Sequence, residues 1–150
     1  MEINIRPYDT RDRESLLQVL KSNIPTYFHP DELEDFKSYL YKELEDYFVL
    51  EVDGKVVAGA GINYELSENL AKLSWDFISS DWQQQGLGSK LMQHRLGHIL
   101  SNPAIKHITV RTSQLAEEFY LKHGFVEVER KKDYWAEGFD MVKMEYAFTR

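Results

Sequence analysis

A polar loop with two glycines separates two apolar-patterned segments, and it is the stretch of the chain best suited to bind an anion. It reads Ile78-Ser79-Ser80-Asp81-Trp82-Gln83-Gln84-Gln85-Gly86-Leu87-Gly88-Ser89. A helix that begins near Gly86 presents backbone N–H groups without helical partners and the positive end of its dipole, and together these bind phosphate. Glycine at positions 86 and 88 lets the backbone approach such a ligand closely. The loop therefore predicts a phosphate site. The alternative interpretation is a turn that needs glycine for its backbone conformation alone.

Two other phosphate-binding motifs do not fit this loop. A P-loop has four residues between its first glycine and the Gly-Lys-Ser/Thr that follows, whereas one residue separates Gly86 from Gly88. A dinucleotide-binding fingerprint needs a third glycine where this chain has Leu91, and an acid about 20 residues further on, where it reads Ile105-Lys106-His107. Both motifs are therefore excluded.

Two segments resemble the signatures of one enzyme family. The run Gln83-Gln84-Gln85-Gly86-Leu87-Gly88 resembles the Gln/Arg-x-x-Gly-x-Gly/Ala signature of the GNAT N-acetyltransferase superfamily. About thirty residues on, Ser113-Gln114-Leu115-Ala116-Glu117-Glu118-Phe119-Tyr120-Leu121-Lys122-His123-Gly124-Phe125 is similar to the second signature, Asn-x-x-Ala-x-x-Leu-Tyr-x-x-x-Gly-Phe. The order of predicted strands and helices fits the same family over nearly the whole chain.

The resemblance implies where acetyl-CoA binds. In the family the cosubstrate lies where the fourth and fifth strands splay apart, its pantetheine along the fourth strand and its pyrophosphate at the loop and helix start. A backbone N–H of the fourth strand, which maps to Ile78, stabilises the oxyanion. The cofactor-binding residues implied here are Asp76, Phe77, Ile78, Gln83, Gln84, Gln85, Gly86, Leu87, Gly88, Ser89, Ser113 and Tyr120.

The resemblance also implies a general acid. Tyr120 maps to the tyrosine that protonates the departing CoA thiolate, and a phenol of pKa ~10 holds its proton at neutral pH. The alternative for Tyr120 is an aromatic side chain that packs its helix on the sheet. Ser113 stands where the family has an asparagine that contacts CoA, so Ser113 is either a cofactor contact or a helix cap.

The general base is less well defined. Some relatives place a glutamate early on the fourth strand, but Lys72 stands there and cannot accept a proton while it is charged. Asp76, expected on the same face as Lys72, and Glu65, at the end of the preceding strand, are the candidates, each acting through water. The alternative for both is an ordinary solvated carboxylate.

Hydrophobic periodicity predicts the elements that place these residues. Alternating residues predict strands at 3–7, 48–52, 55–63, 71–79, 106–111, 125–129 and 139–148. Apolar spacings of three and four predict helices at roughly 10–22, after Pro30, at 86–100 and at 113–122. In the strand at 71–79 we expect Leu73, Trp75 and Phe77 to share one face. The resemblance implies an α/β (α+β) GNAT fold: a mixed, mostly antiparallel sheet of about seven strands flanked by about four helices.

Composition bounds the class of protein. The 150 residues, 43% of them hydrophobic, predict one folded domain over 1–150. Lys and Arg total 18 against 25 Asp and Glu, a net charge of −7, which argues against nucleic-acid or anionic-membrane partners. The absence of cysteine excludes disulfides, thiolate zinc sites and a cysteine nucleophile. With no signal-peptide pattern at Met1–Pro7 and no apolar run of ~20 residues, we expect a cytoplasmic protein.

No metal site is predicted. His94 and His98 have a spacing that can hold zinc, but residue 95 is arginine where a metalloprotease helix has glutamate. We expect Leu91, Leu96, Ile99 and Leu100 to pack inward and to leave both histidines on a polar surface.

Two further features bear on the acceptor. Residues 31–46 hold seven acids and two lysines. This segment forms either an acidic rim that attracts a cationic amine or a solvated helix face. Tyr134 and Trp135 lie between the last two strands. Three interpretations are open: these aromatics select the substrate, they cover a sheet edge, or they contact another subunit. The third interpretation predicts a homodimer.

The sequence therefore predicts an N-acetyltransferase that moves an acetyl group from acetyl-CoA directly to a primary amine, and we expect a small-molecule acceptor. Two alternatives stay open. The first is a protein or peptide acetyltransferase that acts on an N-terminus or a lysine. The second is a non-catalytic acyl-CoA-binding module, which Ser113 and the unassigned base would suit.

Overall fold

The computed structural model describes residues 1–148 as one seven-stranded sheet with four α-helices packed on it. The helices are α1 (Arg13–Lys21), α2 (Glu32–Lys42), α3 (Leu87–Leu100) and α4 (Glu117–Lys122). The strands are β1 (Ile3–Pro7), β2 (Asp46–Val52), β3 (Lys55–Glu65), β4 (Leu70–Ile78), β5 (His107–Thr112), β6 (Phe125–Ala136) and β7 (Phe139–Tyr146). The predicted α+β fold is confirmed.

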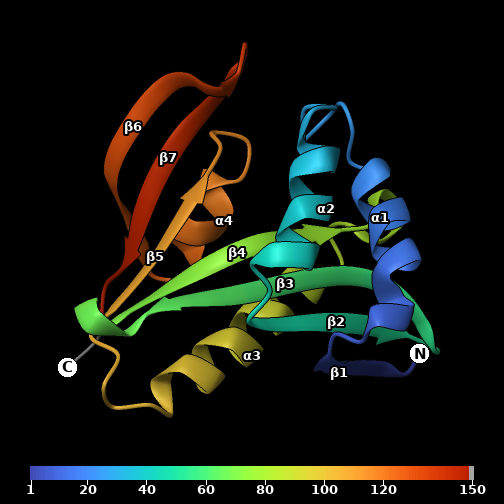
Figure 1. Ribbon diagram of the computed structural model, residues 1–150, viewed down its shortest axis with the longest axis horizontal. Helices are drawn as coiled ribbons and strands as arrows, with labels where there is room; N and C mark the ends of the chain where they lie inside the picture. The colour runs from blue at the N-terminus through green and yellow to red at the C-terminus, as the bar shows by residue number, and fades with distance from the viewer. Residues whose placement is uncertain (149–150) are drawn as a thin grey trace.

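The sheet has the order β1-β2-β3-β4-β5-β7-β6, and β4–β5 is its parallel pair. That pairing runs from Leu70↔His107 to Leu73↔Val110 and then stops. Beyond Leu73 the two strands diverge, so β5 and β7 turn away from the end of β4 (Figure 1). The predicted splay is confirmed, and it leaves the β5-facing edge of residues 74–78 without a strand partner.

The two faces of the sheet carry separate apolar cores. The helices α1 and α2 cover one face, and α3 lies on the other (Figure 1). Gly59 and Gly61 of β3 allow the first of these packings, because a Cβ at either glycine would lie 2.6 Å from the ring or hydroxyl of Tyr47. On the second face, Tyr120 of α4 shares one core with Leu87 and Leu91 of α3.

A β-bulge in β4 changes which side chains face which core. Gly59 pairs with Phe77 but Gly61 pairs with Ser74, so two residues of β4, Trp75 and Asp76, lie opposite one residue of β3. Trp75 has a positive φ of 46°, and a bulge of this kind reverses the alternation of side chains.

The expectation that Leu73, Trp75 and Phe77 share a face is therefore wrong. Leu73 packs in the core on the α3 face, whereas Trp75 and Phe77 pack in the core on the α1–α2 face. The expected common face of Lys72 and Asp76 is wrong for the same reason, since the bulge lies between them. Asp76 is instead directed to α3 and α4.

Several element boundaries differ from the predictions. Residues 113–116 form a turn, so the predicted helix at 113–122 begins at Glu117. The predicted strand at 125–129 continues to Ala136, and β7 pairs with it from Phe125 to Lys131 and again at Ala136. No helix within residues 1–148 is long and apolar enough to cross a membrane. The cytoplasmic location stays a prediction.

Candidate active site

Three side chains from three elements meet at the bulge of β4. The Tyr120 hydroxyl of α4 donates to Asp76 Oδ2 at 2.5 Å. The Arg95 Nη2 of α3 donates to the same oxygen at 2.6 Å, and its Nη1 donates to the Gly61 carbonyl at 3.2 Å. The structure therefore brings together two predicted site residues, Tyr120 and Asp76, with one that was not predicted, Arg95.

Only the carboxylate of this cluster is accessible. The Asp76 side chain is 28% exposed and the Arg95 side chain 1%, and Tyr120 is 1% exposed. Both hydrogen bonds use Oδ2, so no described residue donates to Asp76 Oδ1. A molecule that reaches this point of the splay meets the carboxylate of Asp76 before it meets the phenol.

Burial fixes the protonation of the other two groups. Burial first, and then the charge of Asp76, raises the pKa of Tyr120 well above 10, so the phenol is neutral at physiological pH. For Arg95, burial lowers the pKa, but the attraction of Asp76 and Tyr120 outweighs it and the net direction is upward. Arg95 is therefore a buried, charged guanidinium beside a carboxylate.

The sequence analysis missed Arg95, although its position was visible. The residues of α3 that face the sheet recur every four positions: Leu87, Leu91, Arg95 and Ile99. The expectation that Leu100 packs inward is wrong, because Leu100 is 48% exposed while Arg95 is buried. An arginine in an apolar stripe at spacing four is the signal that could have found it.

The start of α3 has the form of an anion site. Gly86 has a φ of 79°, and Lys90 N donates to its carbonyl, so the helix leaves the N–H groups of Leu87, Gly88 and Ser89 without helical acceptors. A Cβ at Gly86 would meet no atom within 4 Å, so space is open there. Gln84 and Gln85 are exposed beside it.

Gly88 and Leu87 also have structural roles. A Cβ at Gly88 would lie 3.1 Å from the Phe119 ring and 3.2 Å from Ile78, so the absence of a side chain lets these groups pack closely. The side chain of Leu87 is buried in the core on the α3 face. The Ser89 hydroxyl lies 2.9 Å from His123 Nε2.

The end of β4 is held by an amide network that includes Gln83. Its Nε2 donates to Asn23 Oδ1 at 2.8 Å and to the Ile78 carbonyl at 3.3 Å, and Asn23 Nδ2 donates to the same carbonyl at 2.9 Å. The side chain of Gln83 therefore binds protein. Asn23, which is 3% exposed, was not predicted.

The backbone N–H of Ile78 points toward the splay. Ser79 N donates to Val57 O at 2.8 Å on the β3 side. Because successive N–H groups of a strand point to opposite edges, the N–H of Ile78 is directed away from β3. Phe77 and Ile78 themselves pair with Gly59 and Ala58 of β3. The geometry thus suits the oxyanion contact that the resemblance implies at Ile78.

Ser113 and Glu65 are placed differently from this cluster. The Ser113 hydroxyl accepts from Leu115 N at 3.2 Å, so it caps the turn before α4. Glu65 forms an ion pair with Lys72, and hydrogen bonds from Glu68 and Lys72 lower its pKa. Glu65 pairs with Leu70, six residues before Asp76, which is about 20 Å along a strand. The structure does not bring Glu65 to Tyr120.

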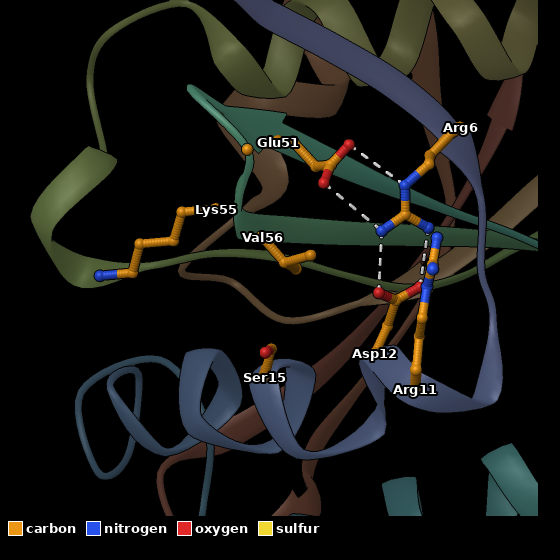
Figure 2. A pocket seen from close by; sticks show the side chains of 8 residues that line it. Arg6, Arg11, Asp12, Ser15, Glu51, Lys55 and Val56 are labelled. Carbon is orange, nitrogen blue, oxygen red and sulfur yellow. Dashed lines mark hydrogen bonds and ion pairs between the residues drawn. The ribbon is translucent and has the colours of Figure 1, made fainter.

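Two surface pockets involve none of the predicted site residues. One, of about 480 Å³, is lined by Arg6, Arg11, Asp12, Ser15, Glu51, Gly54, Lys55 and Val56. Figure 2 shows the Arg6 guanidinium between the carboxylates of Asp12 and Glu51, with Lys55 extending away. Both acids of this pocket are therefore paired with Arg6. The second, of about 290 Å³, lies beside Tyr64 and His98.

The histidines of α3 pack on an aromatic ring. His94 and His98 lie edge-on to Phe48, with ring centroids 4.6 and 5.5 Å from it. His98 Nε2 also lies 3.1 Å from Asp46 Oδ2. Within residues 1–148, no three His, Cys, Asp or Glu side chains gather in a way that could hold a metal ion.

The aromatic pair near the β6–β7 turn is supported by β5. The Arg111 guanidinium lies 4.9 Å from the Tyr134 ring centroid and 5.4 Å from that of Trp135. Trp135 Nε1 donates to the Thr112 carbonyl at 3.1 Å. Both aromatics stay partly exposed, and the homodimer suggested by them stays a prediction.

A family model described as an acetyltransferase (GNAT) domain matches residues 18–148. A comparison with curated protein sequences found no match. Among solved structures, the chain is similar to the ribosomal-protein-S18-alanine N-acetyltransferase of Escherichia coli, with 19% identity, 99% of this chain and 96% of that chain covered, and a TM-score of 0.81.

Two other solved structures have a similar fold. The ribosomal-protein-alanine N-acetyltransferase of Brucella melitensis has 16% identity, 97% and 99% coverage of this chain and that chain, and a TM-score of 0.74. The spermidine N-acetyltransferase of Vibrio cholerae, in complex with CoA and spermine, has 18% identity, 95% and 94% coverage and a TM-score of 0.75. At these identities the structural likeness shows the fold.

Proposed function

This chain belongs to the GNAT acetyltransferase family, whose members use acetyl-CoA, and from that premise we propose that it acetylates the primary amine of a small molecule. One observation carries the proposal. The open edge of β4 at residues 74–78 meets both the free N–H groups at the start of α3 and the Asp76–Tyr120 pair. A thioester, its phosphates and a proton-transfer pair would therefore share one site.

The residues at the splay fit acetyl-CoA. The open space at Gly86 and the N–H groups that follow it suit the pyrophosphate. Backbone groups of Asp76, Phe77 and Ile78 suit the pantetheine, with the Ile78 N–H directed at the thioester oxygen. Acetyl-CoA supplies an acyl group activated as a thioester. Because these contacts are mostly to backbone, the side chains of Gln84 and Gln85 carry little of the affinity. The Ser113 hydroxyl accepts from Leu115 N and keeps its own proton to donate to the cofactor.

Proton transfer is assigned to Asp76 and Tyr120. Asp76 Oδ1, which accepts from no described residue, takes a proton from the attacking amine nitrogen. As the C–S bond breaks, the Tyr120 hydroxyl gives its proton to sulfur. Because Tyr120 contacts Oδ2, the proton held on Oδ1 of Asp76 returns to the phenol through a solvent water. Overall, one proton moves from nitrogen to sulfur. Burial makes a free phenolate costly, so the two transfers at Tyr120 are coupled.

A small acceptor is favoured by a contact across the splay. The ring of His29, which precedes α2, lies 6.1 Å edge-on from the ring of Phe139 in β7. This contact links the helices that cover β4 with the strands beyond the splay, and it leaves less room for an extended peptide. The segment 31–46, with seven acids against two lysines, favours a cationic amine.

An amine screen tests the proposal. Free thiol release from acetyl-CoA is measured with a panel of polyamines, aminoglycosides and alkylamines, and with short peptides that carry a free N-terminus or a lysine. The chain has no cysteine, so a thiol reagent reports released CoA alone. Turnover with a small amine supports the proposal. Turnover with peptides only identifies a protein acetyltransferase, and acetyl-CoA binding with no thiol release identifies a non-catalytic binding module.

A further inference from the structure

Arg95 lies in a position where an ionised side chain is costly. Its side chain is 1% exposed and stands in the apolar stripe of α3 between Leu91 and Ile99. Burying a guanidinium in such a stripe is unfavourable unless partners compensate for it. Arg95 has partners for Nη1 and Nη2, but its Nε has no hydrogen-bond partner. The fold therefore tolerates an incompletely satisfied buried cation.

The partners of Arg95 lie at the bulge that distinguishes β4 from a regular strand. Nη1 binds the Gly61 carbonyl, and Gly61 pairs with the residue before the bulge. Nη2 binds Asp76 Oδ2, on the bulge itself. One planar guanidinium thus connects the neighbouring backbone with the carboxylate, and its two nitrogens fix the side chain of Asp76 relative to β3.

This arrangement leaves a defined part of the carboxylate free. Arg95 and Tyr120 both donate to Oδ2, so Oδ1 is the oxygen without a donor among residues 1–148. Two other titratable groups lie near Arg95. Tyr47 of β2 donates its hydroxyl to the Trp75 carbonyl at 2.7 Å, and Tyr39 of α2 donates its hydroxyl to Asn63 Oδ1 at 2.9 Å. Tyr47 therefore supports the bulge and does not compete for Asp76.

We infer that Arg95 is a positioning residue for acetyl transfer: it holds the Asp76 side chain with one oxygen on Tyr120 and the other available to the acceptor amine. The inference rests on the proposed function. Both terminal nitrogens of Arg95 bind protein oxygens, those of Gly61 and Asp76, so Arg95 acts through Asp76. Its removal should affect the proton-transfer step and leave the contacts for acetyl-CoA in place.

Arg95→Met and Arg95→Lys test the inference together. Methionine keeps an unbranched, buried side chain without the charge, and lysine keeps the charge without the planar pair of donors. For each variant we would measure acetyl-CoA binding by calorimetry, a thermal melt, and kcat and KM from pH 6 to 9.5 with an amine that the wild type acetylates.

For Arg95→Met we expect kcat to fall about 100-fold, as is typical when a reacting group is misplaced, while the Kd for acetyl-CoA changes less than threefold. Arg95→Lys should recover about tenfold of the lost kcat. A merely structural role would lower the melting temperature without lowering kcat at constant acetyl-CoA affinity, and lysine would recover no kcat.

The other outcomes also decide whether the inference and the proposed function hold. If a folded Arg95→Met keeps kcat within threefold of the wild type, the inference is wrong. If Arg95→Met does not fold, Arg95→Lys decides: unchanged kcat refutes the role of the guanidinium, and a tenfold loss at constant acetyl-CoA affinity supports it. A wild type that transfers no acetyl group refutes the proposed function and this inference together, whereas an active wild type with equally active variants refutes the inference alone.

Discussion

Among single residues, the proposed acetyl-transfer mechanism depends most on the hydrogen bond between Tyr120 and Asp76. The hydroxyl that is proposed to protonate the thiolate already donates to a carboxylate, and burial keeps it protonated. Tyr120→Phe removes the transferable proton and little else. We expect kcat to fall about 100-fold, with a small change in the KM for acetyl-CoA.

Tyr146→Phe is the matched control for Tyr120→Phe. Tyr146 is another partly buried tyrosine next to Phe125, with ring centroids 5.4 Å apart, and it lies outside the proposed site. Steady-state kinetics of the two variants should differ clearly. Equal activity of Tyr120→Phe and Tyr146→Phe would show that Tyr120 only packs α4 on the sheet.

A second residue-scale prediction concerns the ion pair of Figure 2, away from the site. Arg6 donates to both oxygens of Asp12 at 2.8 Å, and this hydrogen bonding lowers the pKa of the nearly buried Asp12 carboxyl. A lowered folded-state pKa stabilises the protein above the unfolded pKa of ~3.9, and this stabilisation is lost as the pH falls through the lower folded value.

Asp12→Asn should therefore reduce the free energy of unfolding by about 1–3 kcal/mol at pH 7. The difference from the wild type should shrink below about pH 4. Urea unfolding at pH 7, 5 and 3 measures it. A destabilisation that stays constant over this range would mean that the charge of Asp12 does not contribute.

Among the helices and strands, alanine substitutions at two glycines are expected to change the stability of the fold in opposite directions, because the two glycines have different surroundings. A Cβ at Gly61 of β3 would lie 2.6 Å from the Tyr47 ring and 2.8 Å from the Tyr39 hydroxyl, whereas a Cβ at Gly97 of α3 would meet no atom within 4 Å. Gly61→Ala should destabilise the fold by about 1–3 kcal/mol through overpacking. Gly97→Ala should stabilise it by roughly 0.5–1 kcal/mol through helix propensity.

Chemical denaturation of the two variants checks this account of how α1 and α2 pack on the sheet. If Gly61→Ala were as stable as the wild type, the aromatic side chains over β3 would have room to move. The close packing on that face would then be wrong.

Element type and order were predictable because apolar periodicity survives along most of the chain. The segment at 86–100 is helical as expected, and the alternation at 48–52 lies within β2. The bulge at Trp75 was not predictable. A period of two continues through it in the sequence, and the extra residue shows only in the pairing of Gly59 and Gly61. The placement of Asp76 against Arg95 follows from that bulge and was missed with it.

Some parts of the candidate site could be predicted from the sequence, and others could not. The proposed phosphate site at the start of α3 follows from Gly86 and the polar loop, and Tyr120 follows from the resemblance alone. Glu65 was chosen as a candidate base because it ends β3, but the end of β3 and the end of β4 lie at opposite ends of a hairpin, so Glu65 is far from Asp76. Gln83 was named for the cofactor, but its side chain binds Asn23, which no sequence pattern indicated.

At the scale of the whole molecule, charge is distributed unevenly. The net charge is −7, and residues 31–46, with seven acids and two lysines, contribute −5 of it. If this segment attracts a cationic amine, the KM for that amine should rise several-fold between about 50 and 500 mM NaCl, because salt screens exposed charges. The kcat should change little. A KM independent of salt would make the acidic segment a solvated helix face.

We propose that acetyl-CoA binds at the splay with its pyrophosphate at Gly86. Calorimetry with two glycine variants tests this binding site. Gly86→Trp fills the open space at the start of α3. Gly54→Trp is the control, since Gly54 has a similar φ of 83° and equally open space but lies in the β2–β3 turn. We expect the wild type and Gly54→Trp to bind acetyl-CoA, with a rise in melting temperature of about 5–10 °C at ~100 times the Kd. Gly86→Trp should show neither binding nor the rise. Equal binding by all three folded proteins, or none by the wild type, would contradict the proposed site.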